Sequence, residues 1–389
     1  MKFNASKKVY AHIDCNSFFA SCEVLRNPWL KGKCVCVWGE IIVAASYEAK
    51  RFGIKTWTPI WEAKRILWQK GVFLYPDLQF YKKISKRFTD FLSLYSPDIE
   101  IFSIDEAFVD ITWAAISFWD DYLKFAVHLK EEIYNRIGIP VSLWVSNTKI
   151  KAKIFSDINK PFWECVEFDD LFISKILSKL KVDDIPFIGR RLGERLQYLC
   201  KSAEDFRQLS FWKVDELMWK NGTDLWLELN WVDVMSFRGN PIPKSISRTS
   251  SFNKKMTCDK EFLWSEIIVH FSKAYHILTR YNLELKSIAI YLRDKDFVRY
   301  VFDFSFREHT NIRQELVRAL RTIFDNKIPF DKLYRSSWVI FDDFKEYVPK
   351  QLSVYDFDNR KFEKNKKLFA AIETMNKKFW KKAVNVGLI

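Results

Sequence analysis

Three acidic residues stand where short apolar runs end, and their types and spacing are suited to chemistry. Asp105 and Glu106 are adjacent in EIFSIDEAFVD, residues 100–110, and Asp14 closes the apolar run VYAHI. The period-two pattern around the pair predicts a strand, a tight turn and a second strand. Because buried carboxylates are costly without a partner, the pair is either a solvated turn or the ligand of a cation.

The position of Asp14 favours the cation. This residue ends a predicted strand and precedes CNSFFASCEVL, in which apolar residues recur at helical spacing. Carboxylates that gather at strand ends form an oxygen-rich pocket that suits Mg²⁺. Two Mg²⁺ ions held by shared carboxylates are a common apparatus for phosphoryl and nucleotidyl transfer. Asp14, Asp105 and Glu106 are therefore the candidate catalytic residues.

The elements that must position these acids follow an α+β pattern. Strands are predicted at Cys34–Val37, Ile41–Ala45, Val72–Tyr75 and Val141–Val145, and helices at Tyr47–Phe52, Pro59–Lys70, Asp77–Tyr95, Ser117–Ile137 and Lys149–Ile158. Helices that cover one face of a mixed sheet describe an α+β domain. From Lys175 the pattern becomes helical with short loops. KVDDIPFIGRRLGERLQYL there resembles a helix-hairpin-helix, with its turn at Pro186–Gly189.

The last third of the chain has a linker and then a different pattern. Two prolines and a glycine break the periodicity in RGNPIPKSIS, residues 238–247. Beyond this linker we expect a split βαβ arrangement, one face of whose sheet could lie against nucleic-acid phosphates. Its strands are predicted at Arg248–Phe252, Lys286–Leu292, Val298–Phe306 and Tyr334–Phe341, and its helices at Lys260–Tyr281 and Ile312–Phe324.

Composition and charge exclude several classes of protein. Hydrophobic residues make up 48% of the 389 residues, which excludes a disordered chain. We expect a cytoplasmic protein, because no apolar run reaches membrane-spanning length, the start lacks a signal-peptide core, and the seven cysteines form no CxxC or zinc spacing. Residues 1–237 carry 33 basic and 31 acidic side chains, whereas residues 238–389 carry 30 and 18. The excess of basic residues after residue 237 favours a C-terminal part that binds a polyanion such as nucleic acid. The alternative is a positively charged surface that only keeps the protein in solution.

Three stretches together resemble the Y-family (translesion) DNA polymerases of the UmuC/DinB type. They are HIDCNSFFASCE at residues 12–23, ASYEAKRFGIK at 45–55 and SIDEAFVD at 103–110, in the family's order and spacing. The similarity runs from about Val9 to about Phe344, and the tail beyond it places the chain nearer UmuC than DinB.

The resemblance implies a right-hand, α+β multidomain polymerase fold. Its expected parts are a palm at 1–15 and 77–170, small fingers at 16–76, a helix-hairpin-helix thumb at 171–237, a linker at 238–247, a split βαβ little finger at 248–346, and a flexible basic tail at 347–389. In such a fold Asp14 and Asp105 would bridge two Mg²⁺ ions, and Glu106 would hold the ion nearest the primer 3′-OH. The backbone carbonyl of Cys15 is the family's additional ligand.

The same resemblance implies a nucleotide site. Asn16, Ser17 and Phe18 would contact the incoming nucleotide, and Phe19 would be the steric gate that leaves no room for a ribose 2′-OH. The alternative is that Phe18 and Phe19 are both core residues. Tyr47, Lys50, Arg51 and Lys160 would bind the triphosphate, with the division of work between Lys50 and Arg51 left open.

Two further contacts are implied outside the palm. The turn and helix start at Ile188, Gly189, Arg190 and Arg191 would bind a DNA phosphate through backbone N–H groups. The family usually has Gly where this chain has Phe187, which weakens a close approach, and an ordinary helical pair is the alternative. In the tail, QLSVYDF resembles a sliding-clamp peptide with anchors at Gln351, Leu352, Val354 and Tyr355.

The implied function is template-directed, low-fidelity DNA synthesis across lesions, in DNA repair and the SOS damage response. Its partners would be primer-template DNA, deoxynucleotides, the sliding clamp and accessory damage-response subunits. An open site with small fingers and a tethered little finger discriminates poorly. The alternative from another class is a non-catalytic paralogue that acts as a DNA- and clamp-bound scaffold, although such relatives lose the acids kept here. A palm-fold nucleotide cyclase would not explain the helix-hairpin-helix or the basic C-terminal third.

Tryptophan and glycine usage is unusual. The chain has 16 Trp and only 10 Gly, or 10/389 ≈ 2.6%, against an average glycine usage of about 7%. Several tryptophans stand where the family has turn glycines, namely Trp38, Trp57, Trp61, Trp144, Trp163, Trp338 and Trp380. Aromatic residues lining a DNA channel are one explanation. The other is that these codons are UGA, read as glycine in the source and as Trp in the printed sequence.

Overall fold

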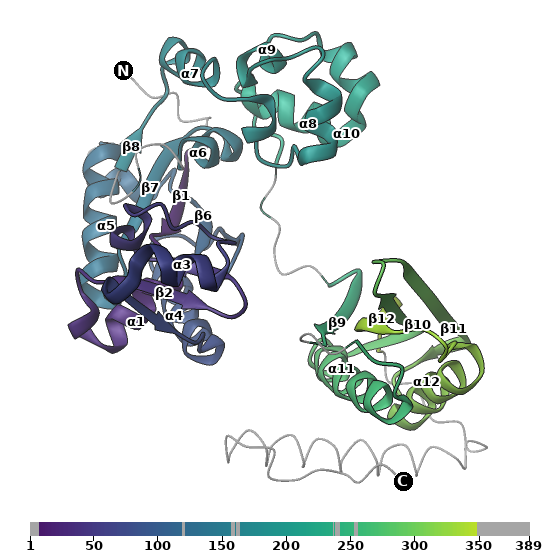
Figure 1. Ribbon diagram of the computed structural model, residues 1–389. Coiled ribbons are helices and arrows are strands. Elements are labelled where there is room, and N and C mark those ends of the chain that lie inside the picture. The colour runs from purple at the N-terminus through teal and green to yellow at the C-terminus, as the bar shows by residue number, and fades with distance from the viewer. Residues whose placement is uncertain are drawn as a thin grey trace, which may run out of the picture. The chain divides into compact units, whose positions relative to one another are not determined.

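The computed structural model describes residues 8–118, 121–156, 160, 164–235, 237, 242–252 and 256–347. The chain divides into two compact units, residues 1–239 and 240–389. Figure 1 shows the elements of both, with the first unit purple to teal and the second green to yellow. Within the described part of the chain, no helix has the length and apolarity that crossing a membrane requires.

The first unit is built on a five-stranded sheet in the order β5-β6-β1-β7-β8. The strands are β1 (Tyr10–Cys15), β5 (Ile99–Ile101), β6 (Glu106–Asp110), β7 (Val141–Ser146) and β8 (Glu164–Val166). The central strand β1 is antiparallel to both β6 and β7, whereas β8 runs parallel to β7. This is the mixed sheet expected of a palm, and β1 within it carries Asp14.

Helices cover both faces of this sheet. The helices α1 (Phe18–Arg26), α4 (Leu78–Leu92) and α5 (Tyr122–Ile137) share one hydrophobic core with β1, β6 and β7, and Figure 1 shows α5 running beside β7. The helix α6 (Lys149–Ser156) packs on the other face, against β1 and β7. Successive side chains of a strand alternate between faces, so Ile13 enters the first core while His12 and Asp14 face away from it.

A three-stranded sheet, in the order β3-β2-β4, forms a separate small core. It consists of β2 (Cys34–Trp38), β3 (Ile42–Ala45) and β4 (Gly71–Leu74), with α2 (Tyr47–Lys50), α3 (Ile60–Leu67) and the short 3₁₀ turns η1 (Pro28–Leu30) and η2 (Trp68–Lys70) around it. Ser46 caps α2 by accepting a hydrogen bond from the amide of Ala49. These residues lie within the stretch expected to form the fingers.

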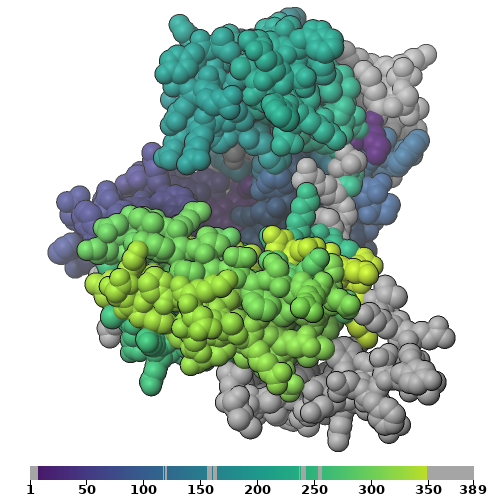
Figure 2. Space-filling model, turned by 90° about the vertical axis from the view of Figure 1, so that its right-hand side faces the viewer, coloured from purple at the N-terminus to yellow at the C-terminus, as the bar shows by residue number. Residues whose placement is uncertain are grey.

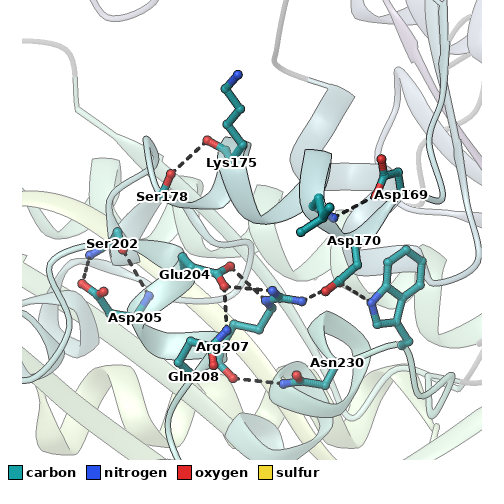
Figure 3. A network of polar contacts seen from close by, with 12 residues as sticks. Asp169, Asp170, Lys175, Ser178, Ser202, Glu204, Asp205, Arg207, Gln208 and Asn230 are labelled. Carbon is teal, nitrogen blue, oxygen red and sulfur yellow. Dashed lines mark hydrogen bonds and ion pairs between the residues drawn. The ribbon is translucent and has the colours of Figure 1, made fainter.

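The helical part that follows has its own core. It contains α7 (Asp170–Leu177), η4 (Val182–Asp184), α8 (Arg190–Leu196), α9 (Ala203–Arg207) and α10 (Phe211–Leu229). A buried guanidinium ties these helices together, as Figure 3 shows. Arg207 donates to Asp170 at 2.6 Å and to Glu204 at 2.8 Å. Because Asp170 opens α7 while Arg207 and Glu204 lie on α9, this network fixes two helices far apart in sequence.

The second unit, green to yellow in Figures 1 and 2, is a sheet covered on one face. The strands β9 (Ser245–Ser251), β10 (Leu283–Asp294), β11 (Arg299–Thr310) and β12 (Tyr334–Glu346) pair in the antiparallel order β11-β10-β12-β9. The helices α11 (Lys260–Arg280) and α12 (Arg313–Lys327) supply the apolar side chains that bury the inner face. The expected strand, helix, strand, strand, helix, strand sequence is confirmed.

Some predicted boundaries were wrong. The helix expected at Ser117–Ile137 begins at Tyr122, because the side chain of Asp121 caps it and a 3₁₀ turn, η3 (Ala114–Phe118), precedes it. The linker expected at residues 238–247 ends earlier, since β9 pairs with β12 from Ser245. The acidic pair is not symmetric at a hairpin tip, because Glu106 already belongs to β6. The clamp peptide lies outside the described residues.

Candidate active site

Strand pairing brings two of the predicted acids together. Asp14 on β1 is directly opposite Glu106 on β6, and His12 is opposite Phe108 in the same register. Directly opposed residues in an antiparallel pair have their Cβ atoms within about 5.5 Å of each other. Since Asp14 and His12 alternate with the core residue Ile13, both acids and the histidine share the face that does not enter the first core.

The third acid is fixed by the loop before β6. The amide of Cys15 donates to the carbonyl of Asp105 at 2.8 Å, which ties this loop to the end of β1. The hydroxyl of Ser103 donates to the Asp105 carboxylate, and its oxygen accepts the Asp105 amide. Asp105 therefore lies beside Cys15, immediately after Asp14. The structure brings all three acids to one corner of the sheet.

Burial makes the charge of Asp14 unfavourable. Burial raises the pKa of Asp14 to about 6, the nearby Lys160 opposes that shift, and Asp105 and Glu106 add to it. Lys160 Nζ lies 3.1 Å from Asp14 Oδ1. A buried carboxylate among like charges favours any cation that can reach it. This corner therefore has the electrostatics of a cation site.

Glu106 has the opposite balance, through partners that the sequence analysis missed. Burial acts to raise the pKa of Glu106, but hydrogen bonds from His12 and Lys153 lower it to about 2. Lys153 Nζ lies 2.6 Å and His12 Nε2 lies 3.1 Å from the same carboxylate oxygen, Oε2. The period-two pattern of β1 could have indicated His12, which lies two residues before Asp14. Lys153 comes from α6, and no sequence signal connected it to Glu106.

The donor set suits a hard divalent cation, although the side chains are not gathered around one point. Carboxylates and backbone carbonyls are the ligands that Mg²⁺ prefers, and Asp14, Asp105, Glu106 and the Cys15 carbonyl provide both kinds. In the described part of the chain, however, no three Asp, Glu, His or Cys side chains form a ready-made metal cluster. Instead Lys160 and Lys153 lie against two of the acids. The oxygen donors are therefore of the kind that Mg²⁺ binds, although lysine ammonium groups contact two of the carboxylates.

Basic residues expected to bind the triphosphate lie next to this corner. Lys50 Nζ donates to the Ser17 hydroxyl at 2.9 Å and lies over the Tyr47 ring. Partial desolvation, and then the nearby charge of Lys160, lower the pKa of Lys50, while Asp14 opposes this shift. Lys160 thus contacts Asp14 directly, and Lys50 lies within electrostatic reach of the same acid. Arg51 ends α2 at the surface.

The turn between β1 and α1 has an unusual conformation. Ser17 is left-handed, with φ 47° and ψ 48°, and its side chain does not cap the helix. Asn16 is buried, and its side-chain oxygen accepts a hydrogen bond from the Ser142 hydroxyl at 2.9 Å. The Asn16 side chain therefore anchors the turn to β7. Nucleotide contacts by Asn16 and Ser17 stay predictions.

The two phenylalanines have different surroundings. Phe18 is 3% exposed and belongs to the core shared by β1 and α4. Phe19 is partly buried, and its ring stacks on Tyr81 with centroids 4.5 Å apart and planes 17° apart. Tyr81 is held in turn by donating to Glu23 at 2.7 Å. Of the two rings, Phe19 is therefore the one that is still partly exposed. Its stacking partner, Tyr81, is held in place by the hydrogen bond to Glu23.

Comparisons with known proteins agree with this arrangement. Residues 13–157 match the impB/mucB/samB family, and residues 243–354 match the C-terminal domain of that family. A DNA polymerase IV from Acetivibrio thermocellus is 27% identical over 403 residues, which cover 98% of each chain. The chain belongs to the Y family of DNA polymerases.

Solved structures support the fold of this Y-family polymerase. A Y-family DNA polymerase chimera of Dbh and Dpo4 matches with a TM-score of 0.71 and 24% identity, over 87% of this chain and 100% of the other. A Dbh ternary complex with partially disordered substrates matches over the same shares, with a TM-score of 0.58 and 25% identity. The predicted right-hand class, with palm, fingers, thumb and little finger, is confirmed. The placement nearer UmuC than DinB stays a prediction.

The turn before α8, in the stretch predicted to be the thumb, has a backbone conformation that a phenylalanine disfavours. Phe187 has φ 71°, in the region that suits glycine, and its ring packs against that of Phe102. Gly189 precedes α8, with open space where a Cβ would lie. The Ile188 side chain is buried, so only its backbone could meet DNA. Phosphate binding by Ile188, Gly189 and the exposed Arg190 and Arg191 stays a prediction.

Proposed function

We propose that this DNA-directed DNA polymerase performs low-fidelity translesion synthesis through two Mg²⁺ ions held by Asp14, Asp105 and Glu106. The observation that supports the proposal is the opposition of Asp14 and Glu106 across β1 and β6, with Asp105 tied to Cys15 beside them. A cluster of three acids at a strand end is costly to bury even with lysines against two of them, and nucleotidyl transfer is a reaction that uses such a cluster. The relatives named above are DNA polymerases, which agrees with this use of the corner.

Each acid would have its own task. When bound, Mg²⁺ would lower the pKa of the primer 3′-OH and neutralise the charge of the triphosphate. Asp14 and Asp105 would hold both ions, the Cys15 carbonyl would complete the set, and Glu106 would hold the ion on the primer side. His12 and Lys153 already bind Glu106 through one oxygen, Oε2. The other oxygen, Oε1, is therefore the one that Glu106 can direct to an ion.

The lysines would act on the nucleotide. Lys160 lies 3.1 Å from Asp14, and Lys50 lies 2.9 Å from Ser17, at the start of α1. Ammonium groups that neutralise carboxylates in the free enzyme are also suited to binding phosphate oxygens. Lys50 and Lys160 would then bind the triphosphate, with Tyr47 donating a hydrogen bond to it. Phe19 would lie beneath the sugar and exclude a 2′-OH.

Primer extension by the full chain tests this function. We expect Mg²⁺-dependent extension on an undamaged template, insertion opposite an abasic site, and loss of both when Mg²⁺ is chelated. The rival proposal is a DNA-bound scaffold without catalysis, which agrees less well with the retention of all three acids. A folded protein that binds primer-template yet extends neither template would support the scaffold and contradict our proposal.

The remaining proposals concern partners and location. Because the relatives are DNA polymerases, primer-template DNA and deoxynucleotides would be the substrates, and the open face of the little-finger sheet would lie against DNA. The tail peptide with Gln351, Leu352, Val354 and Tyr355 would dock on a sliding clamp. We further propose a cytoplasmic enzyme that works with accessory subunits of the damage response. The support for these last proposals is the family resemblance of the sequence.

A further inference from the structure

Four tryptophans have a backbone conformation that bulky residues avoid. Trp57, Trp68, Trp219 and Trp231 have φ angles of 76°, 45°, 56° and 72°. Only a few per cent of non-glycine residues have positive φ, and Asn, Asp and His supply a large share of these. Of the nine described non-glycine residues with positive φ, four are Trp, a residue that occupies 16 of 389 positions. Positive φ is therefore concentrated in one residue type that has no intrinsic reason to adopt it.

Two of these residues lie beyond the region that any side chain tolerates well. The left-handed region has ψ near +30° to +60°, but Trp68 has ψ −123° and Trp219 has ψ −157°. Positive φ combined with strongly negative ψ is a conformation that glycine adopts readily and that residues with a Cβ avoid. Trp68 is the capping residue immediately after α3, and Trp219 interrupts the helical geometry inside α10. A helix stop and a helix kink are both places where glycine is commonly used.

Three of the four side chains gain little that would offset this strain. Trp57, Trp68 and Trp219 are 75%, 76% and 79% exposed, so their indoles bury little apolar surface. Stacking on nucleic-acid bases would explain exposed indoles, but it does not require positive φ. Trp231 does have partners, because its Nε1 donates to Asp170. Its backbone is nevertheless left-handed, like that of Gly32, Gly53 and Gly138.

We infer that the natural protein carries glycine at positions 57, 68, 219 and 231. The codon at each position would be UGA, which the source reads as glycine and the printed sequence reads as Trp. The low glycine content, 10 residues against 16 Trp, agrees with this exchange. The inference is independent of the proposed catalytic function, since it rests on backbone angles and exposure.

Other tryptophans lack these signs and serve as controls. Trp226 lies in helical backbone within α10, and its Nε1 donates to the Leu209 carbonyl at 3.0 Å. Trp264 on α11 packs its ring against Phe324. Both fit their surroundings as tryptophan. Of the tryptophans that the sequence analysis placed at family glycine positions, only Trp57 also has a positive φ angle among the described residues.

The remaining positions from that expectation divide into three groups. Trp61 lies in α3 and Trp338 in β12, where backbone angles make no demand for glycine. Trp38 and Trp144 bury an indole N–H that has no hydrogen-bond partner among the described residues, which makes them the next candidates. Trp163 and Trp380 lie outside the described residues.

Two measurements on the natural gene and protein test the inference. We expect the gene to have UGA at positions 57, 68, 219 and 231, and UGG at 226 and 264. Peptide mass spectrometry of the protein purified from its source should give glycine masses at the first four positions and Trp masses at the two controls. UGG codons or Trp masses at the four positions would overturn the inference.

A recombinant comparison tests the physical argument separately. Trp68→Gly and Trp219→Gly, made in the full chain with the printed sequence, should each raise the melting temperature by several degrees, because each relieves backbone strain. Trp264→Gly should lower it, since that change removes a packed ring from a helix. If the printed chain does not fold, the variant with glycine at all four positions should give soluble, cooperatively melting protein. Equal destabilisation by the test and control changes would contradict the inference.

Discussion

Asp14 and Glu106 are directly opposite each other in the register of β1 and β6, yet their pKa values are shifted in opposite directions. Burial dominates at Asp14 and raises its pKa to about 6. Hydrogen bonds from His12 and Lys153 outweigh burial at Glu106 and lower its pKa to about 2. The positive partners of Glu106 thus outweigh its burial, whereas Lys160 does not outweigh the burial of Asp14, so of these two acids Asp14 gains more from an added cation.

Removing the charge of one acid should therefore abolish catalysis without unfolding the protein. We expect Asp14→Asn and Asp105→Asn to lower primer extension by roughly a hundredfold to a thousandfold or more, because an electrostatic group at the reacting centre contributes on that scale. DNA affinity and the thermal midpoint should change little. Asp90→Asn, at an exposed ion pair with Lys86, is the matched control and should be fully active. Near-normal extension by either test variant would sink the metal assignment.

The neighbouring phenylalanines should separate selectivity from stability. Phe19→Ala should raise ribonucleotide incorporation relative to deoxyribonucleotide by roughly 10–200-fold or more, since rejection of one added hydroxyl by shape is of that order. Phe18→Ala should instead cost about 3–5 kcal/mol of stability, because Phe18 fills the core. Single-nucleotide insertion assays and urea unfolding measure the two effects. Unchanged sugar selectivity in Phe19→Ala would place the gate elsewhere.

The sequence predicted the acids because their signals are local. A carboxylate at the end of a β run and an acidic pair between two such runs are visible in a few residues, and strand pairing then forced Asp14 and Glu106 together. The partners of Glu106 were not visible in this way. Lys153 reaches it from α6, 47 residues along the chain, and only the packing of α6 on the sheet places it there.

Boundaries were missed where a cap or a strand partner decides them. The helix α5 starts after Asp121 because that side chain accepts the Lys124 amide, although helical periodicity extends further back. The strand β9 starts at Ser245 because β12 offers backbone partners to a serine-rich stretch with weak strand propensity. For the tryptophans, the sequence showed that something was unusual but not at which positions. Composition raised the question, but only φ and ψ angles could select Trp68, Trp219 and Trp231.

The tail should act in clamp binding and not in chemistry. We expect the triple change of Leu352, Val354 and Tyr355 to Ala to leave distributive synthesis unchanged and to remove stimulation by the sliding clamp, because these apolar anchors would fill its pockets. Changing Phe362 and Leu368 to Ala, further along the same tail, is the control and should keep the stimulation. Primer extension with and without the clamp measures both. An equal clamp response in the triple variant and the wild type would refute the proposal.

The stability of the second unit should depend on a buried histidine. Burial lowers the pKa of His270 below its ordinary value of 6.5, the nearby Lys273 lowers it further, and Glu266 opposes them. His270 lies on α11, is 2% exposed, and its Nε2 lies 3.2 Å from the Ser250 hydroxyl on β9. The folded state therefore prefers the neutral imidazole. Between the lowered pKa and 6.5, the unfolded chain binds the proton more readily than the folded chain.

The sign of the pH effect follows from that preference. The contribution of His270 to stability is fully present above pH 6.5, and it is lost as the pH falls from there through the lowered folded-state pKa. We expect His270→Gln, which keeps a polar group near Ser250 but cannot take up a proton, to lose less stability than the wild type on acidification. Urea unfolding of both full chains at about pH 7.5 and about pH 5.5 measures the difference, and contributions from other groups such as His12 cancel between them. An identical loss in the two proteins would show that His270 does not carry the effect.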